Sequence, residues 1–275
     1  MGRAVSALLQ KLRGLRSEAG LASPVSAPPV SAEVRRLLQF RTKHTRSSLQ
    51  ATSVDRDVAG EEIEPGLRFT ETYADWPSPP GVIDARFARL DDPVRGANLL
   101  HFDTETTGLA GGTGTRAFMI GAADWVGERF RIRQLTITSM AAEAAMLRTF
   151  SQWIDRETVL VSYNGKCYDA PLLATRYRLA RMPNPLVGVR HLDLLHPVRR
   201  RWKGVWENCR LATVERQLLG VVREDDLPGS EAPAAWLTYL RGGPATNLRR
   251  VAHHNAQDLR SLAGVLIRMA SPFGD

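Results

Sequence analysis

Apolar residues gather in short runs along the middle of the chain, and these runs predict strands. Asn98–Phe102 is an apolar run that ends at an acidic residue, which is typical of a buried strand. Ala117–Ala123 and Phe130–Thr138 are two further runs, and in the second one arginines alternate with apolar residues as on a half-exposed strand. Thr158–Tyr163 is rich in β-branched residues and predicts the strand that follows.

Helical spacing of apolar residues appears between and after these strands. In Ala141–Ile154, the apolar residues Leu147, Phe150 and Ile154 recur every three to four positions and predict one helical face. Three strands, a helix, a strand and then mostly helices predict the α/β class, with a mixed β-sheet flanked by α-helices. Further helices are expected at Pro171–Met182, Leu211–Leu219, Ala234–Leu240 and Leu248–Met269.

Residues 1–62 differ in composition from the rest of the chain. Residues 1–57 contain ten Lys and Arg side chains and four acidic ones, and residues 21–32 are rich in Pro, Ser and Ala. Such a composition resists regular structure. We therefore predict a basic, partly disordered N-terminal arm over residues 1–62 and a folded domain over residues 63–275. A plain linker fits the same composition equally well.

The overall composition is that of a soluble globular protein, with 43% hydrophobic and 24% charged residues. A net charge of +8 favours polyanions as partners, and nucleic acid is the usual one. Two cysteines do not make a disulfide framework, so a reduced, cytoplasmic compartment is expected. No apolar run reaches the roughly 20 residues of a membrane span, which predicts no membrane partner. The sequence does not identify any protein partner.

Two acidic residues mark the end of the first predicted strand. Asp103 and Glu105 are two positions apart, so their side chains point to the same face of a strand. Carboxylates held side by side repel each other unless a cation lies between them, and hard oxygen ligands suit Mg²⁺ or Mn²⁺. A solvated strand end fits a lone Asp-x-Glu pair as well, but Thr-Thr-Gly-Leu after the pair makes this string far rarer.

Three acidic motifs, in this order, resemble those of a nuclease family. Asp103–Leu109 is similar to the first motif of the ribonuclease H-like, DnaQ-type (DEDD) 3′→5′ exonucleases. Tyr163–Asp169 follows a predicted strand and resembles the second motif, and His253–Asp258 resembles the third, which we expect to open the last helix. Over roughly residues 64–270 the chain is also similar to the YprB-like branch. That similarity rests on Ile63–Leu67, Gly111–Thr115, Trp206–Leu211, Asp226–Gly229 and His254-Asn255.

The resemblance implies hydrolysis assisted by two divalent cations, Mg²⁺ or Mn²⁺. Asp103, Glu105 and Asp258 would hold the two cations, and Asp169 would bind one of them. The protein would then supply geometry and charge, while the cations lower the pKa of a water molecule. Four clustered carboxylates without cations would be strongly disfavoured, so the site itself predicts metal.

A histidine would serve as the general base, and two neighbouring residues compete for this role. His254 precedes Asp258 by four residues, which places both on one face of a helix, whereas His253 precedes it by five. His253 would still reach Asp258 from a loop before the helix. The YprB-like resemblance has its histidine at the position of His254, which we favour; the other would be a capping or surface histidine. A zinc site at this pair lacks accompanying cysteines or a further spaced histidine.

Polar and basic residues near the motifs are candidates for substrate contact. The run Arg199–Trp206 mixes cations, which follow phosphates, with tryptophans, whose faces stack on unpaired bases. The same run also fits a solvated face beside core tryptophans. Asp193 is expected to cap a helix or to support the metal site, and Tyr168 to pack behind Asp169. The predicted substrate contacts are Thr106, Asn164, Lys166, Arg199, Arg200, Arg201 and Trp202.

The predicted function is therefore 3′→5′ exonucleolytic hydrolysis of phosphodiester bonds in single-stranded nucleic acid. No motif distinguishes DNA from RNA, because that choice rests on contacts to the 2′-hydroxyl. The alternative is an inactive nucleic-acid-binding module on the same fold, although every acidic residue of the three motifs is present.

Overall fold

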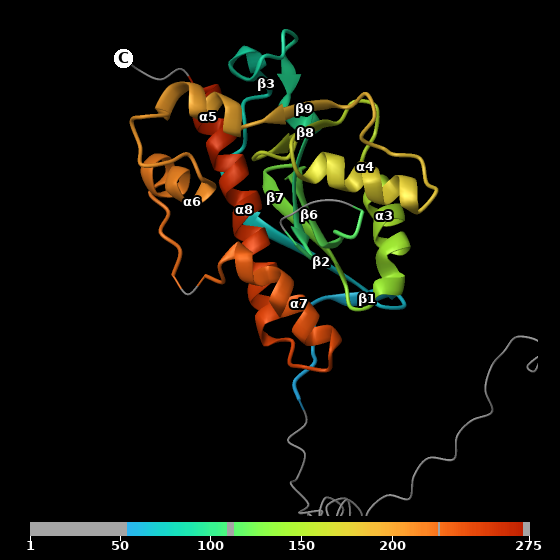
Figure 1. The fold of residues 1–275 in the computed structure, drawn as a ribbon. Helices are drawn as coiled ribbons and strands as arrows, with labels where there is room; N and C mark the ends of the chain where they lie inside the picture. Colours follow the sequence, from blue (N-terminus) through green and yellow to red (C-terminus); the bar gives the residue numbers. More distant parts are fainter. Residues whose placement is uncertain (1–53, 109–112, 225, 272–275) are drawn as a thin grey trace, which may run out of the picture. The chain divides into compact units, whose positions relative to one another are not determined.

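Seven strands form one mixed sheet in the computed structural model, which describes residues 54–108, 113–224 and 226–271. The strand order is β1-β2-β7-β6-β5-β8-β9, antiparallel from β1 to β5 and parallel from β5 through β8 to β9. The predicted mixed sheet with flanking helices is thus confirmed (Figure 1). The strands are β1 (Glu61–Glu64), β2 (Leu67–Asp75), β5 (Leu99–Thr106), β6 (Ala117–Val126), β7 (Arg129–Ile137), β8 (Val159–Ser162) and β9 (Arg190–Asp193), with β3 (Val82–Ile83) and β4 (Val94–Arg95) as a separate pair.

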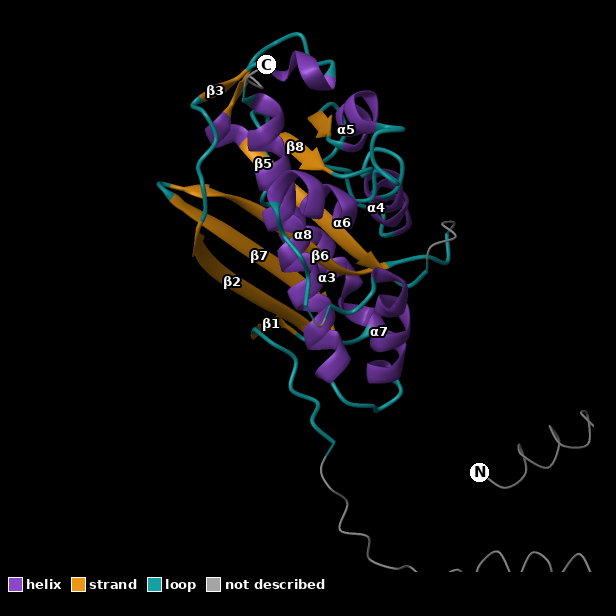
Figure 2. Ribbon diagram, turned by 90° about the vertical axis from the view of Figure 1, so that its left-hand side faces the viewer, coloured by secondary structure: helices purple, strands orange, loops and turns teal. Residues whose placement is uncertain are grey.

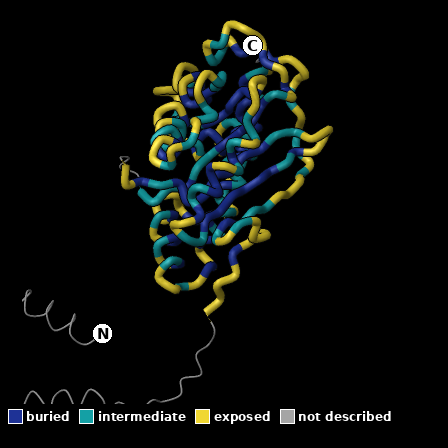
Figure 3. The backbone as a smooth tube through the Cα atoms, turned by 90° about the vertical axis from the view of Figure 1, so that its right-hand side faces the viewer, coloured by how far each residue is buried: buried dark blue, intermediate teal, exposed yellow. Residues whose placement is uncertain are grey.

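Helices lie on both faces of the sheet. The helix α8 packs against β5, β6 and β7 on one face, where it runs across the strands (Figure 2). The helix α3 packs against β2, β6 and β7, and Figure 1 shows it beside α4 on the opposite side from α8. The central strands between these layers are buried along most of their length (Figure 3). The helices are α3 (Glu143–Ser151), α4 (Asp169–Leu179), α5 (Leu195–Trp202), α6 (Leu211–Val214), α7 (Ala232–Leu240) and α8 (Thr246–Ala270).

One face of α8 is apolar, and this face explains why the helix covers the sheet. Leu248, Val251, Leu259 and Leu262 lie along that face, and all four are buried. With Asn255 midway between Val251 and Leu259, the buried positions recur every three or four residues. Asn255 occupies the same stripe and is fully buried. A buried amide group needs hydrogen-bond partners, so the packing of α8 brings a polar group to the sheet together with its apolar ones.

The sequence-based elements correspond to β5, β6, β7, β8, α3, α4, α7 and α8. The expected helix at Leu211–Leu219 begins as α6 and continues as a π-helical turn, Glu215–Leu219. One expectation is wrong: the third motif does not open the last helix, because α8 already begins at Thr246. His253 is therefore helical and does not lie in a preceding loop.

Residues 55–57 lie against the connection between α7 and α8. The backbone N–H of Ala245 donates to the carbonyl of Asp55 at 2.8 Å, and the Arg56 guanidinium lies 4.2 Å from the centre of the Tyr239 ring. The predicted arm lies outside the described residues up to residue 53, and its boundary at residues 62 and 63 stays a prediction. None of the described helices is both long enough and apolar enough to cross a bilayer.

Candidate active site

The carboxyl ends of three parallel strands, β5, β8 and β9, meet at one edge of the sheet, and the acidic residues gather there. Asp103 and Glu105 belong to β5, Asp169 begins α4 soon after β8, and Asp193 ends β9. Asp258 reaches the same edge from α8, which packs on β5. This edge is where open α/β sheets bind their ligands.

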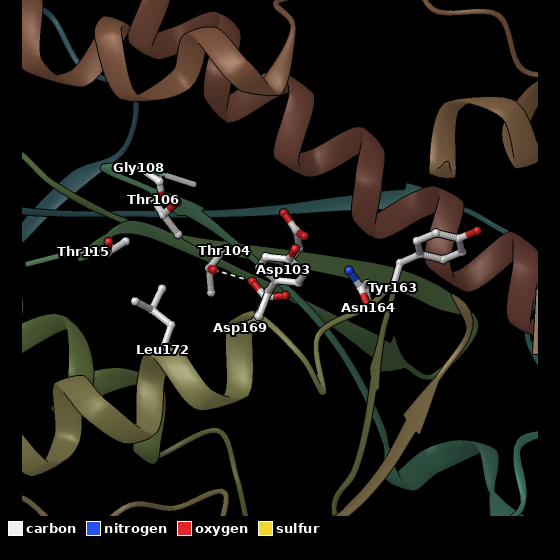
Figure 4. Close-up of a pocket in the computed structure, with 10 residues that line it drawn as sticks. Asp103, Thr104, Thr106, Gly108, Thr115, Tyr163, Asn164, Asp169 and Leu172 are labelled. Carbon is white, nitrogen blue, oxygen red and sulfur yellow. Dashed lines mark hydrogen bonds between the residues drawn. The ribbon is translucent and has the colours of Figure 1, made fainter. Parts of the chain in front are cut away.

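A cavity of about 240 Å³ lies between β5 and α4 (Figure 4). The carboxylates of Asp103 and Asp169 lie beside each other at this cavity, and the Thr104 hydroxyl donates a hydrogen bond to Asp169. Thr106 and Asn164, two predicted substrate contacts, also line it. Tyr168 does not pack behind Asp169 as expected. Tyr168 is 62% exposed and lines the same cavity.

Burial and like charge act together on the acidic residues. Burial, followed by the charges of Asp258 and Asp169, raises the pKa of Glu105 to about 8. Burial raises the pKa of Asp169 to about 6 in spite of the hydrogen bond from Thr104. The pKa of Asp103 is raised well above its usual range, by burial and then by the neighbouring carboxylates. The fully ionised cluster is therefore costly unless a cation offsets its charge.

In the absence of divalent cations, we expect stability to fall as the pH rises from about 6.5 to about 8. The folded state holds a proton on Glu105 up to about pH 8, whereas the unfolded state releases it near 4.5, so raising the pH favours unfolding. His101 and His191, whose pKa values burial lowers to about 4, act in the opposite direction only below about 6.5. Thermal melts in EDTA across this range measure the effect. A rising midpoint, or an equal fall in Glu105→Gln, would contradict the assignment.

The donor chemistry of the site fits hard divalent cations. Asp103, Glu105, Asp169 and Asp258 supply oxygen atoms only, which suit Mg²⁺ or Mn²⁺. As placed, no three His, Cys, Asp or Glu side chains of the described residues are grouped closely enough to hold one ion. Asp258 instead accepts a hydrogen bond from the guanidinium of Arg223.

His254 lies beside the acids, whereas His253 is exposed. His254 Nε2 is 3.7 Å from Asp258 Oδ2, as expected for residues four apart on a helix. His254 Nδ1 is 2.8 Å from both carboxylate oxygens of Asp226 and 3.1 Å from Arg223 Nη1. The contacts to Asp226 are shorter than the one to Arg223, and a carboxylate can only accept a hydrogen bond. We therefore infer that Nδ1 carries the hydrogen and donates it to Asp226. That tautomer leaves Nε2 as a proton acceptor on the side of Asp258.

Asn255 holds Asp103 in place from α8. Its Nδ2 donates to Asp103 Oδ2 at 2.9 Å, and its Oδ1 accepts from Gln134 Nε2 at 2.9 Å. Gly121 of β6 permits this approach, because a Cβ atom there would lie 2.0 Å from Asn255 Oδ1. A close approach of another element is a common reason for a glycine inside a strand.

Asp193 fixes the loop that leads to Asp169. This side chain is buried, and its carboxylate accepts hydrogen bonds from the backbone N–H groups of Asn164 at 2.8 Å and Lys166 at 3.0 Å. Asn164 has a φ of 68°, a left-handed conformation that is strained for most residues and that these bonds help to hold. A third bond, from the N–H of Leu195 at 3.1 Å, lies at the start of α5.

A second cavity, of about 570 Å³, adjoins the same loop and is strongly basic. Its lining residues include Arg89, Lys166, Arg199, Arg200 and Lys203, together with His196 and Asp193.

Arg201 and Trp202, the other two predicted substrate contacts of this region, do not line the basic cavity. Trp202 stacks on Trp206 with ring centres 4.5 Å apart and an angle of 8° between the planes, so one face of its ring is covered. The Arg201 guanidinium lies 5.5 Å from the centre of the Trp202 ring.

Comparison with known proteins places this architecture in a family. The family profile described as the RNase H superfamily matches residues 100–270, which contain all three acidic motifs. The chain belongs to the RNase H superfamily. It is 39% identical over 174 residues to YprB of Bacillus subtilis (strain 168), described as an uncharacterized protein. That match covers 63% of this chain and only 42% of YprB. Among solved structures, the family B DNA polymerase of the archaeon Pyrobaculum calidifontis is similar with a TM-score of 0.49 and 18% identity, over 61% of this chain and 24% of the polymerase.

Membership of the RNase H superfamily and the identity with YprB confirm the predicted family resemblance. The catalytic, metal-binding and substrate-binding roles of individual residues stay predictions. Asn255, Asp226 and Arg223 have no role predicted from the sequence, yet each contacts an acidic residue of the site or His254. Asn255 had a detectable signal, because it is a polar residue within the apolar stripe of α8.

Proposed function

We propose that this member of the RNase H superfamily is a metal-dependent exonuclease that removes nucleotides from the 3′ end of single-stranded nucleic acid. One observation carries the proposal: carboxylates from β5, α4 and α8 meet at a single edge of the sheet, where burial and then the charges of Asp258 and Asp169 raise the pKa values of Asp103 and Glu105. An arrangement of this kind is unfavourable for folding by itself, which is typical of a functional site.

Asp103, Glu105, Asp169 and Asp258 are the residues that would hold the cations. When bound, a pair of divalent cations supplies positive charge for the phosphodiester group and lowers the pKa of an attacking water. Asn255 and Thr104 keep Asp103 and Asp169 oriented through the hydrogen bonds described above. The remaining steps fall to other side chains.

His254 is suited to take the proton from the attacking water. Asp226 accepts the hydrogen on Nδ1, so Nε2 is left with a lone pair on the side of Asp258. Histidine accepts protons efficiently near neutral pH, and a carboxylate partner stabilises the imidazolium that results.

The cavity at Asp103 and Asp169 would receive the terminal nucleotide. Its lining combines carboxylates with Asn164, Thr106 and the exposed ring of Tyr168. An exposed aromatic ring stacks on an unpaired base without selecting its sequence. This arrangement favours a single-stranded 3′ end over a paired one.

A labelled-strand assay tests the proposal. DNA and RNA of matched sequence, each carrying a 5′ label, are incubated with Mg²⁺, with Mn²⁺ and with EDTA. We expect a ladder of products shortened from the 3′ end in the metal-containing reactions only. Circular single strands serve as the control, and they should remain intact. No shortening with either metal, or cleavage of the circles, would reject the exonuclease.

An inactive strand-binding module is the second candidate, because Arg223 already binds Asp258. Such a module would bind single strands in the presence of EDTA and leave them intact when Mg²⁺ or Mn²⁺ is added.

The basic cavity is proposed to bind phosphates of the strand that leads to the 3′ end. We expect the triple variant Lys166→Gln, Arg199→Gln, Lys203→Gln to bind single strands more weakly and with less dependence on salt. Each phosphate contact to a single strand contributes about 0.7 to the slope of log K against log salt, so losing three lowers the slope by about 2. Fluorescence anisotropy at several salt concentrations measures both quantities.

The matched control removes the same charge elsewhere. Arg156, Arg241 and Arg268 are exposed and line neither cavity, so replacing all three by glutamine should change the salt slope much less. Equal slopes in the two triple variants would mean that net charge, and not this cavity, determines binding.

A further inference from the structure

Arg223 is a cation that the chain itself places at the acidic site. Its Nε donates to Glu215 at 2.7 Å and its Nη2 donates to the other Glu215 oxygen at 2.6 Å. The same Nη2 also donates to Asp258 Oδ1, and Nη1 lies 3.1 Å from Asp226. One guanidinium therefore joins three carboxylates, and one of these belongs to the four proposed metal ligands.

Glu215 fixes Arg223 in this position. The Glu215 side chain is fully buried in the π-helical turn between α6 and the segment that carries Arg223, and the Ser261 hydroxyl of α8 also donates to it. A buried carboxylate that loses its partner is strongly destabilising, so Arg223 is not free to leave. A guanidinium does not lose its proton in proteins, which makes this positive charge permanent.

Two features separate this contact from an ordinary surface ion pair. The Arg223 side chain is only 12% exposed, and the Asp258 side chain only 16%, so solvent screens their attraction weakly. Asp258 Oδ1 is engaged by Arg223, while Oδ2 is the oxygen near His254. Only part of the Asp258 carboxylate is therefore available to another cation.

We propose that Arg223 competes with divalent cations for Asp258 and so weakens their binding in the substrate-free protein. This inference rests on the proposed function, because it assumes that Asp258 takes part in binding the cations. A positive charge so close to a divalent ion opposes its binding through a poorly screened repulsion. Asp103, Glu105 and Asp169 contact no Arg or Lys side chain at hydrogen-bond or ion-pair distance within the described residues, so a first ion would bind mainly through them.

The experiment measures binding of Mn²⁺ to the substrate-free full chain, by calorimetry and by the spin-resonance signal of free Mn²⁺. We expect Arg223→Gln to raise the affinity by at least about tenfold, since repulsion is removed and Asp258 is released. Arg223→Lys, which retains the charge, should bind Mn²⁺ nearly as the wild type does.

Arg216→Gln is the matched control. Arg216 lies in the same π-helical turn and pairs with the exposed Glu207, so this variant loses the same charge away from the acids. We expect its Mn²⁺ affinity to stay within about twofold of the wild type, because exposed ion pairs are well screened.

The double variant Glu215→Gln, Arg223→Gln keeps the inference testable if Arg223→Gln does not fold. It replaces the buried ion pair by two neutral amides and leaves the net charge unchanged. We expect a smaller rise in affinity, of about threefold to tenfold, because Asp258 is released while Glu215 is also lost. Circular dichroism and thermal melts establish that each variant is folded.

The outcomes separate the inference from the function on which it rests. One outcome would overturn only the proposed role of Arg223. In that outcome the wild type binds Mn²⁺ tightly and Asp103→Asn abolishes the binding, but neither Arg223→Gln nor Arg223→Lys changes the affinity. An absence of Mn²⁺ binding in the wild type and in both variants would overturn the metal site, and the inference with it.

Discussion

Replacing Asp103 by asparagine is expected to lower the rate of strand shortening by at least about 10³-fold. The substitution removes an anionic oxygen ligand from the centre of the acidic site, where charge stabilisation by metal contributes several kcal/mol and each 1.4 kcal/mol is a factor of ten. The shape of the side chain and its hydrogen bond from Asn255 are retained, because an amide oxygen also accepts from Nδ2. The labelled-strand assay with Mn²⁺ measures the rate.

The same variant is expected to be more stable than the wild type when divalent cations are removed. Burial and then the charges of Asp258, Asp169 and Glu105 raise the pKa of Asp103, so its ionised form costs folding energy that a neutral amide does not. A gain of about 1 kcal/mol corresponds to a melting midpoint about 2–4 °C higher for a domain of this size. Thermal melts in EDTA at pH 8 give this value.

The control for both readouts is Asp92→Asn, because Asp92 is an exposed acid outside the site. It should change neither the rate nor the midpoint. Full activity in Asp103→Asn would show that this carboxylate does not hold a cation. A lower midpoint in EDTA would show that the carboxylate stabilises the metal-free fold, contrary to the repulsion argued above.

His254→Ala is expected to slow hydrolysis by about 10²- to 10⁴-fold, the usual contribution of a general base. His253→Ala is its matched control, since the two residues are neighbours on α8 and His253 is exposed. The control should retain activity within about twofold. Both variants should bind single strands as the wild type does, because neither side chain lines the two cavities. Equal losses in the two variants would leave His254 without its assigned role.

The variant Asp226→Asn tests whether the charge of Asp226 supports His254 in proton transfer. An amide oxygen still accepts the Nδ1 hydrogen, but it carries no charge to stabilise the imidazolium, so kcat should fall while the strand concentration for half-maximal rate stays constant. A change in that concentration alone would indicate that Asp226 contacts the strand and does not act through His254.

The sequence predicted the elements whose pattern is local. The buried strands β5, β6 and β8 and the helices α3 and α8 follow from apolar periodicity within each segment, which a short window of residues contains. The strand β2 was missed because its apolar face is short: of its nine residues only Leu67 is buried, and Phe69 packs beside it partly exposed. It forms through pairing with β7 in register from Leu67 to Asp75, a contact that local pattern does not report.

The three acidic motifs were likewise readable in the chain, because Asp-x-Glu on a strand and His-x-x-x-Asp on a helix each fix a shared face by spacing alone. The family resemblance implied that these acids come together, and the order of the parallel strands and the path of α8 supply the physical reason.

The family, the fold class and the acidic residues of the proposed site could thus be predicted from the sequence. The other side chains that act on those acids could be assigned only from the folded arrangement of the chain. Asn255 reaches Asp103 across 152 positions, Arg223 reaches Asp258 across 35, and Asp226 reaches His254 across 28. Contacts over such separations depend on how whole elements pack and on the buried partner that fixes each side chain, and neither is encoded in the spacing of residues along a single helix or strand.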